Sequence, residues 1–257
     1  MTPLPFIAYN TYREAVRDRV LYNLIVFALL MVGSAVLFGQ ISIGIERQVV
    51  INLGLAAITL FGVAIAIFIG IGLVSKEIDR RTLYTVLSRP VRRWEFVLGK
   101  FLGLSFTLVV NTFFMGLGFF AAVFYVSGGM HRGDARLLAA IYFIVLELLI
   151  VTALAMLFST FSSTLLSAVL ALAFFIVGTF AEDLRGFAQM VTGPAHWVAL
   201  GVAYLVPNFA SLNVASSVAH DQPVAAHLVL ANTGYVLCYS AVALAVAVLV
   251  FEYRNLK

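Results

Sequence analysis

A single carboxyl group lies in the middle of an apolar stretch of the sequence. Glu147, in LLAAIYFIVLELLIVTALAMLF, is the only acidic residue clearly inside such a stretch, and Asn111 has a comparable position in another. An ionisable group inside a membrane is unfavourable, so Glu147 is a candidate functional residue. It could line a path through the membrane or a subunit interface. It could instead fix helix packing as a protonated or amide-paired carboxyl, with Asn111 as its hydrogen-bond partner.

Other site chemistry has little support in the sequence. The motif G-x-x-x-x-G-K-[ST], which binds phosphates, does not occur: before Gly99-Lys100, Trp94 occupies the place of the first glycine, and Phe101 follows the lysine. The single cysteine cannot form a metal-binding Cys cluster. We therefore expect no catalytic residues, no metal site and no cofactor in this chain. The histidines, none of them at close ligand spacing, are His131, His196, His220 and His227.

Composition places these residues in an integral membrane protein. The 257 residues are 63% hydrophobic and 11% charged, whereas soluble domains carry about 25% charge. A helix needs about 20 apolar residues to cross a bilayer. The sequence predicts an all-α protein with six membrane-spanning helices and a single transmembrane domain over residues 1–257. The apolar runs are 20–38, 49–74, 101–126, 137–158, 165–180 and 233–251. The polar segment 159–164 could extend the fifth run.

The distribution of basic residues predicts the orientation of these helices. Twelve of the 16 Lys and Arg residues fall on one side of the six-span arrangement and four on the other. Because cytoplasmic segments carry the excess of basic residues, both termini and segment 75–100 should be cytoplasmic. The net charge of +4 is then a topology signal and not evidence for nucleic-acid binding. Residues 1–19 predict a two-faced basic helix that lies along the inner membrane surface.

Segment 75–100 combines charge with apolar side chains. Pro90 ends a helical stretch and predicts a turn, which leaves a short helix at about residues 81–87 with Leu83, Tyr84 and Leu87 exposed among arginines. Exposed apolar groups of this kind are normally covered by a partner. The segment is therefore interpreted as a docking surface, although a solvated loop made basic only for topology is the simpler alternative.

This segment resembles the cytoplasmic loop of bacterial ABC-2 type transporter permeases. The matching residues are Glu77, Arg81, Thr82, Leu83, Leu87, Ser88, Pro90, Val91, Arg93, Trp94, Glu95, Gly99 and Lys100. The resemblance extends to YREAVRDRV near the start, LVPNF at 205–209 and FEYR at 251–254. At Arg81 the chain departs from the glycine that many relatives carry.

The resemblance implies a permease subunit of an ATP-driven transporter, an exporter in a bacterial cytoplasmic (inner) membrane. A short coupling helix would dock on a separate ATPase subunit that holds ATP and Mg. Two ATPase copies and a second permease, identical or homologous, would complete the assembly. The residues implied in ATPase coupling are Glu77, Arg81, Thr82, Leu83, Leu87, Pro90, Arg93 and Glu95.

The segment 181–232 between the fifth and sixth runs is expected outside the membrane. Its apolar part, 195–206, is too short to span and suits a re-entrant or interfacial helix. This part resembles the paired short helices that cap the pathway on the outer side of ABC-2 permeases. The resemblance implies an outer gate at Trp197, Pro207 and Asn208.

Two other classes of protein remain as alternatives. A secondary transporter could use Glu147, but neither an accompanying chain of acidic or histidine side chains nor an inverted internal repeat supports it. A membrane scaffold or polytopic enzyme would need a large soluble surface or polar residues clustered at one depth. The sequence shows neither feature.

Overall fold

A computed structural model describes residues 4–17, 19–41, 44–79, 92–129, 132–190, 193–220, 222 and 224–253. Every regular element in these ranges is helical, and none of the described residues lies in a strand. The helices are α1 (Leu4–Val16), α2 (Arg19–Ile41), α3 (Glu46–Asp79), α5 (Arg93–Ser127), η1 (Arg132–Asp134), α6 (Ala135–Phe161), α7 (Thr164–Thr179), α8 (Ala181–Met190), α9 (Pro194–Leu205), η2 (Ala210–Leu212), α10 (Ala215–Ala219) and α11 (Ala226–Tyr253).

Several of these helices are suited to cross a membrane. Four segments are long and apolar enough, namely Glu46–Gly72, Arg93–Ser127, Ala135–Phe161 and Ala226–Glu252. Two bent pairs, α7 with α8 and α9 with α10, raise the number to six if each pair crosses once. The first predicted run lies in α2, where the apolar stretch Ala28–Ile41 is shorter. The prediction of an all-helical membrane protein is therefore confirmed, with four to six candidate spans among the described residues.

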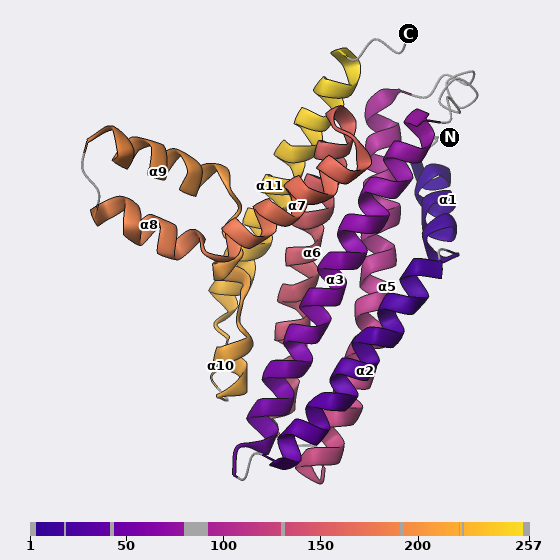
Figure 1. Cartoon of the computed structure of the whole chain (residues 1–257). Helices are drawn as coiled ribbons and strands as arrows, with labels where there is room; N and C mark the ends of the chain where they lie inside the picture. The colour runs from indigo at the N-terminus through magenta and orange to yellow at the C-terminus, as the bar shows by residue number, and fades with distance from the viewer. Residues whose placement is uncertain are drawn as a thin grey trace.

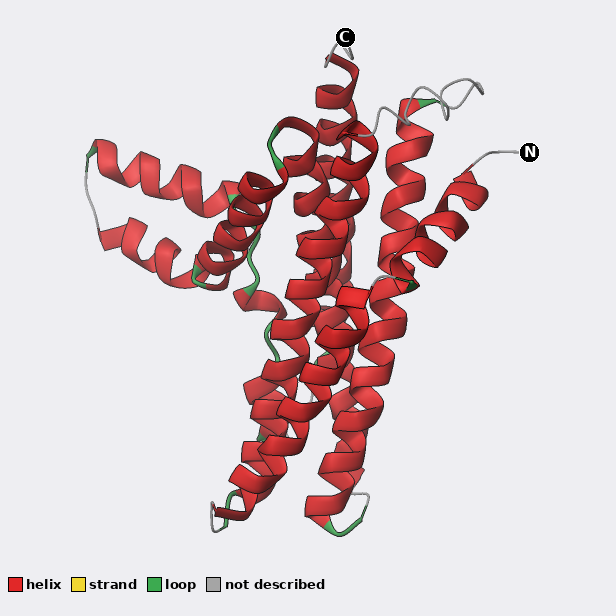
Figure 2. Ribbon diagram, turned by 45° about the vertical axis from the view of Figure 1, so that its right-hand side comes forward, coloured by secondary structure: helices red, strands yellow, loops and turns green. Residues whose placement is uncertain are grey.

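The long helices form a bundle around α6 (Figure 1). This helix contacts α3, α5, α7 and α11, while α2 packs on α3 and α1 packs on α5. Figures 1 and 2 show the start of α1, the end of α3, the start of α5 and the end of α11 at one end of the bundle, here called the termini end. The connections α2–α3 and α5–α6 lie at the opposite end, here called the turn end. Both described chain ends thus lie on one side, as an even number of crossings requires.

Glycines allow the closest helix contacts within the bundle. A Cβ atom at Gly62 of α3 would lie 2.9 Å from Leu148 of α6, and one at Gly103 of α5 would lie 2.5 Å from the carbonyl oxygen of Ala8 in α1. Small residues at such positions let helix backbones approach each other. The glycine patterns of α3 and α5 therefore serve packing inside one chain.

The fifth predicted run forms a helix that is too short to cross. α7 has 16 residues, or about 24 Å, against a hydrocarbon core of about 30 Å. The polar segment 159–164 does not lengthen it, because α6 ends at Phe161 and Ser162 has extended backbone angles (φ −119°, ψ 169°). The Ser162 and Ser167 hydroxyls then share a 2.6 Å hydrogen bond across the break.

The chain leaves the bundle where α7 ends. α8 turns away from α7 by 64° and packs against α9. The two helices, here called the arm, project sideways from the half of the bundle that carries the termini (Figures 1 and 2). The predicted short helix at 195–206 is therefore present as α9. α9 lies on the arm and not at the turn end, because α7 ends before it reaches that end. The expected place of this helix outside the membrane stays a prediction.

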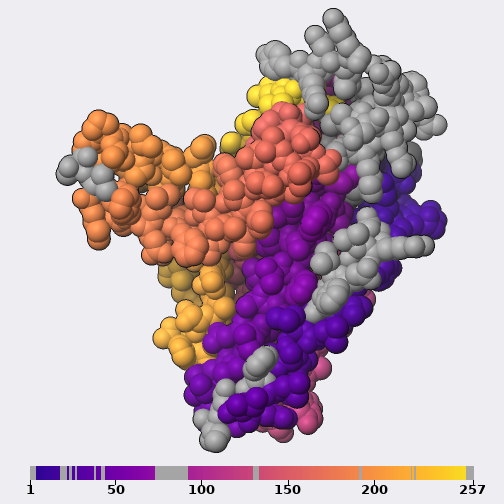
Figure 3. Space-filling model, in the orientation of Figure 1, coloured from indigo at the N-terminus to yellow at the C-terminus, as the bar shows by residue number. Residues whose placement is uncertain are grey.

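The arm carries both charged and apolar exposed side chains. Glu182 and Asp183 are exposed on α8, and on α9 Trp197 is 74% exposed and Tyr204 is 72% exposed. Arg185 lies 5.5 Å above the Tyr204 ring, which joins the two helices. Figure 3 shows the arm, in orange, standing clear of the other described elements on this face.

One ion pair joins the two connections at the turn end. Arg47, at the start of α3, donates from Nη2 to Oδ1 of Asp134 in η1 over 2.8 Å. The Asp134 side chain is only 6% exposed.

Replacement of Arg47 by alanine should destabilise the bundle. We expect Arg47→Ala to lower the free energy of unfolding by about 1.5–3 kcal/mol, because the Asp134 carboxylate stays buried without this charged donor. Thermal unfolding in detergent measures the effect, and Arg13→Ala, which removes an exposed arginine from α1, is the control. Equal stability of the two variants would contradict a stabilising role for the ion pair.

Candidate functional site: a cavity beside the central helix

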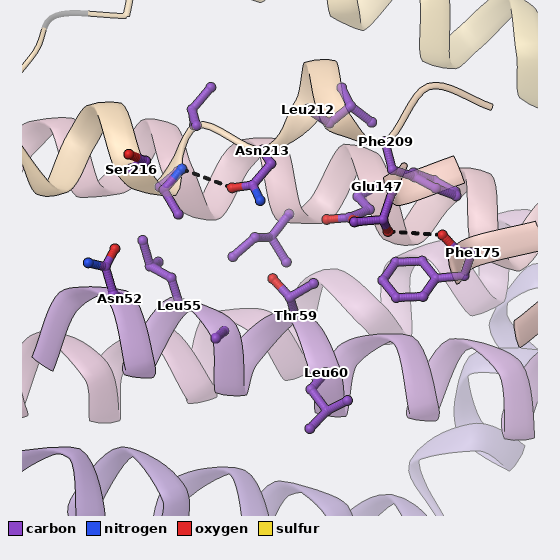
Figure 4. A pocket seen from close by; sticks show the side chains of 16 residues that line it. Asn52, Leu55, Thr59, Leu60, Glu147, Phe175, Phe209, Leu212, Asn213 and Ser216 are labelled. Atoms are coloured by element: carbon purple, nitrogen blue, oxygen red, sulfur yellow. Dashed lines mark hydrogen bonds between the residues drawn. The ribbon is translucent and has the colours of Figure 1, made fainter. Parts of the chain in front are cut away.

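A cavity of about 550 Å³ lies beside the central helix. Its walls come from α3, α6, α7 and segment 209–216, which contains η2 and the start of α10 (Figure 4). Pockets of this size accommodate small organic molecules. Most lining groups are apolar, and the polar side chains that line it are Asn52, Thr59, Glu147, Thr179, Asn213 and Ser216.

Glu147 is the charged residue of this cavity. It lies near the middle of α6, its side chain is 7% exposed, and Figure 4 shows its carboxyl group facing the cavity interior. Within the described part of the chain, this carboxyl group has no recorded hydrogen-bond or salt-bridge partner. Glu147 therefore faces a cavity whose other lining residues carry no charge.

The expected hydrogen bond between Asn111 and Glu147 does not form. Asn111 is buried on α5, and its Nδ2 atom has no hydrogen-bond partner among the described residues. No residue of α5 lines the cavity that Glu147 faces. A similar position along two helices does not determine which face of each helix the residues occupy.

Segment 205–211, whose Phe209 lines the cavity beside α7, is held by one face of α11. Tyr239 donates its hydroxyl to the carbonyl oxygen of Leu205 over 3.0 Å, and the backbone N–H of Asn208 donates to the Tyr235 hydroxyl over 2.9 Å. Asn232 Nδ2 donates to the carbonyl oxygen of Ser211 over 3.3 Å. These three α11 residues recur at helical spacing. That spacing was the available sequence signal, and the sequence reasoning missed it.

The same segment crosses α7 at Gly178. The backbone N–H of Phe209 donates to the carbonyl oxygen of Gly178 over 3.1 Å. A Cβ atom at Gly178 would lie 2.5 Å from the carbonyl oxygen of Pro207. Only glycine therefore permits this close approach without a backbone shift.

The residues predicted for an outer gate do not gather in one place. Pro207 and Asn208 are buried in segment 205–211 next to Phe209, which lines the cavity. Trp197 lies on the exposed arm and does not line the cavity. None of the three residues lines the cavity, and the outer gate stays a prediction.

The described end of the coupling segment contacts the last helix. Arg93 donates from Nη1 to the carbonyl oxygens of Phe251 and Glu252, over 2.6 and 2.9 Å, and lies 5.7 Å above the Phe251 ring. A cation suits the C-terminal end of a helix, where carbonyl groups lack helical partners. Glu95 accepts the backbone N–H of Arg92 over 3.0 Å and thereby stabilises the start of α5.

Most of the other predicted coupling residues lie outside the described residues. These are Arg81, Thr82, Leu83, Leu87 and Pro90. Glu77 lies in the last turns of α3, but its side chain is not described. The structure therefore shows the two helices that flank the segment and its junction with α11.

The helical bundle, with four to six candidate spans among the described residues, defines a polytopic membrane protein. The chain belongs to the ABC-2 family transporter proteins, because the model of that family matches residues 6–256. No curated protein matched in the sequence comparison. The chain is therefore the membrane component of an ABC-2 transporter and not an enzyme, and a separate ATPase subunit binds ATP. Family membership favours ATP-driven transport over the secondary-transport alternative.

Proposed function

We propose that this permease exports its substrate across a bacterial cytoplasmic membrane, with the termini end of the bundle in the cytoplasm. Basic residues support this orientation, because segment 75–100 and both terminal regions carry most of the Lys and Arg residues. α1 would then lie at the inner membrane surface beside the start of α5. The path would include the cavity at Glu147, with Pro207 and Asn208 beside Phe209 of its wall.

The contact between Arg93 and the end of α11 carries the proposal. This contact joins the start of α5, where the coupling segment ends, to α11, whose side chains hold segment 205–211. A push on the start of α5 by an ATPase would thus reach both α11 and the cavity wall. The coupling surface itself would consist of Leu83 and Leu87 with their basic neighbours.

Two permeases and two ATPases would make up the transporter. The arm supports a second permease copy, since it projects sideways with exposed aromatic groups next to Glu182 and Asp183. Charged side chains at membrane depth face protein or water and not lipid. A neighbouring permease covers such a surface better than the bilayer does.

Co-purification tests the coupling surface. The permease is expressed with its ATPase, purified in detergent as wild type and as Leu83→Asp/Leu87→Asp, and the co-purified ATPase activity and mass of the complex are measured. We expect the double variant to insert normally and to co-purify with at least about tenfold less ATPase than the wild type. The reason is that two buried apolar contacts are replaced by charges.

A charge-matched control separates docking from simple electrostatics. Thr85→Asp/Ser88→Asp adds the same two charges to the same segment and is expected to retain the ATPase. Absence of an ATPase from the wild-type preparation would refute the proposal. Equal losses in both variants would refute the assignment of the coupling surface to the leucines, and a mass with one permease would refute the proposed stoichiometry.

A further inference from the structure

The charge of the Glu147 cavity is one-sided. Among the residues that line it, Glu147 is acidic and none is Lys, Arg or His. Glu147 is buried, and no described side chain supplies a positive charge or a hydrogen bond to its carboxyl group. Buried ionic groups without a partner are strongly unfavourable. A cationic ligand in the cavity would supply the counter-charge that the described lining residues lack.

The walls around Glu147 indicate what kind of cation fits. The rings of Phe175 and Phe209 lie 5.4 Å apart at one side of the carboxyl group (Figure 4). Aromatic faces attract organic cations and also cover apolar groups. Thr59 of α3 and Asn213 also line the cavity, with hydroxyl and amide groups that can bind polar substituents.

A metal ion fits this set less well. Bound calcium requires six to eight oxygen ligands, and zinc requires about four N, O or S ligands. Within the described ranges, no group of three His, Cys, Asp or Glu side chains could hold a metal ion. A single carboxylate between aromatic rings is instead suited to a monovalent organic cation.

We propose that the cavity binds an organic cation with an apolar body, with its charged nitrogen or phosphorus centre at the Glu147 carboxylate and its apolar part against Phe175 and Phe209. The assignment of this ligand as the transported substrate rests on the proposed function. Binding itself requires only the cavity. Segment 205–211 places Phe209 in the cavity wall, and α11 holds this segment through side-chain hydrogen bonds.

Binding of tetraphenylphosphonium to the permease–ATPase complex in nanodiscs tests the proposal. Equilibrium dialysis measures the Kd, with empty nanodiscs subtracted. We expect saturable binding to the wild type and a Kd about 30-fold higher for Glu147→Gln, as for the loss of one partner of a buried charge pair. Glu14→Gln makes the same substitution at an exposed position of α1 and should leave the Kd unchanged. Tetraphenylborate, of the same shape and opposite charge, should show no saturable binding.

Three results would overturn the proposal: no saturable binding of tetraphenylphosphonium, equal affinity of wild type and Glu147→Gln, or comparable binding of tetraphenylborate. Should Glu147→Gln fail to fold, Ala56→Trp fills the cavity from an exposed position on α3 and must weaken binding. Unchanged binding in that variant also contradicts the site. ATPase co-purification from the same cells separates the proposed function from the proposed ligand. A complex that assembles with the ATPase but binds no cation contradicts only the proposed ligand.

Discussion

Gly178→Ala is expected to destabilise the permease by about 2–3 kcal/mol. The added methyl group would meet the carbonyl oxygen of Pro207 at 2.5 Å and the Phe209 ring at 2.6 Å. A backbone oxygen cannot rotate away, so segment 205–211 must shift and weaken the bond from Phe209 N–H to Gly178. Alanine favours helix by about 1 kcal/mol over glycine, which offsets only part of this cost. Thermal unfolding of the detergent-solubilised protein measures the change.

Gly234→Ala is the matched control for this prediction. Gly234 lies in α11 and would place its new methyl group in open space, with no atom within 4 Å. The same substitution should therefore be neutral or slightly stabilising. If Gly178→Ala were as stable as Gly234→Ala, the close crossing of segment 205–211 over α7 would be wrong.

Arg93→Ala is expected to uncouple ATP hydrolysis from the permease while the ATPase stays bound. The change removes two charge-assisted hydrogen bonds to the end of α11 and the contact with the Phe251 ring. Such losses are together worth about 2–4 kcal/mol. We therefore expect the permease-dependent part of the ATPase rate to fall at least about tenfold, measured on the purified complex.

The neighbouring arginine provides the control. Arg92 carries the same charge, but its side chain is exposed, so Arg92→Ala should keep more than half of the permease-dependent rate. Arg93→Lys tests the geometry, since a lysine retains the charge without the planar guanidinium. Loss of the bound ATPase in Arg93→Ala would show that Arg93 acts in docking and would contradict its role as a link to α11.

The apolar runs were sufficient to predict the long helices. Runs 49–74, 101–126, 137–158 and 233–251 each lie inside one of the helices α3, α5, α6 and α11, because twenty consecutive apolar residues have few alternatives to a membrane helix. The helices extend past the runs by several residues, as in α5, which begins at Arg93. Polar residues at a helix end can continue the helix in water, and hydropathy does not detect this.

The helix faces that contact one another could not be predicted in the same way. Burial on all sides makes α6 apolar around its circumference, so its sequence does not show which face meets α3, α5 or α7. Asn111 and Glu147 were predicted to form a hydrogen bond because of their similar depth, but Asn111 does not line the cavity that Glu147 faces. The direction of the arm was equally hidden, because it depends on the angle at which α7 ends and not on the composition of α8 and α9.

The hydrogen bonds from α11 to segment 205–211 also determine when the cavity can exist during synthesis. Asn232, Tyr235 and Tyr239 are translated after every residue that lines the cavity. A nascent chain that has inserted α3, α6 and α7 therefore still lacks the side chains that hold the fourth wall. The cavity is completed only when the last described helix enters the bilayer, so an interrupted translation product carries Glu147 without all of its surrounding walls.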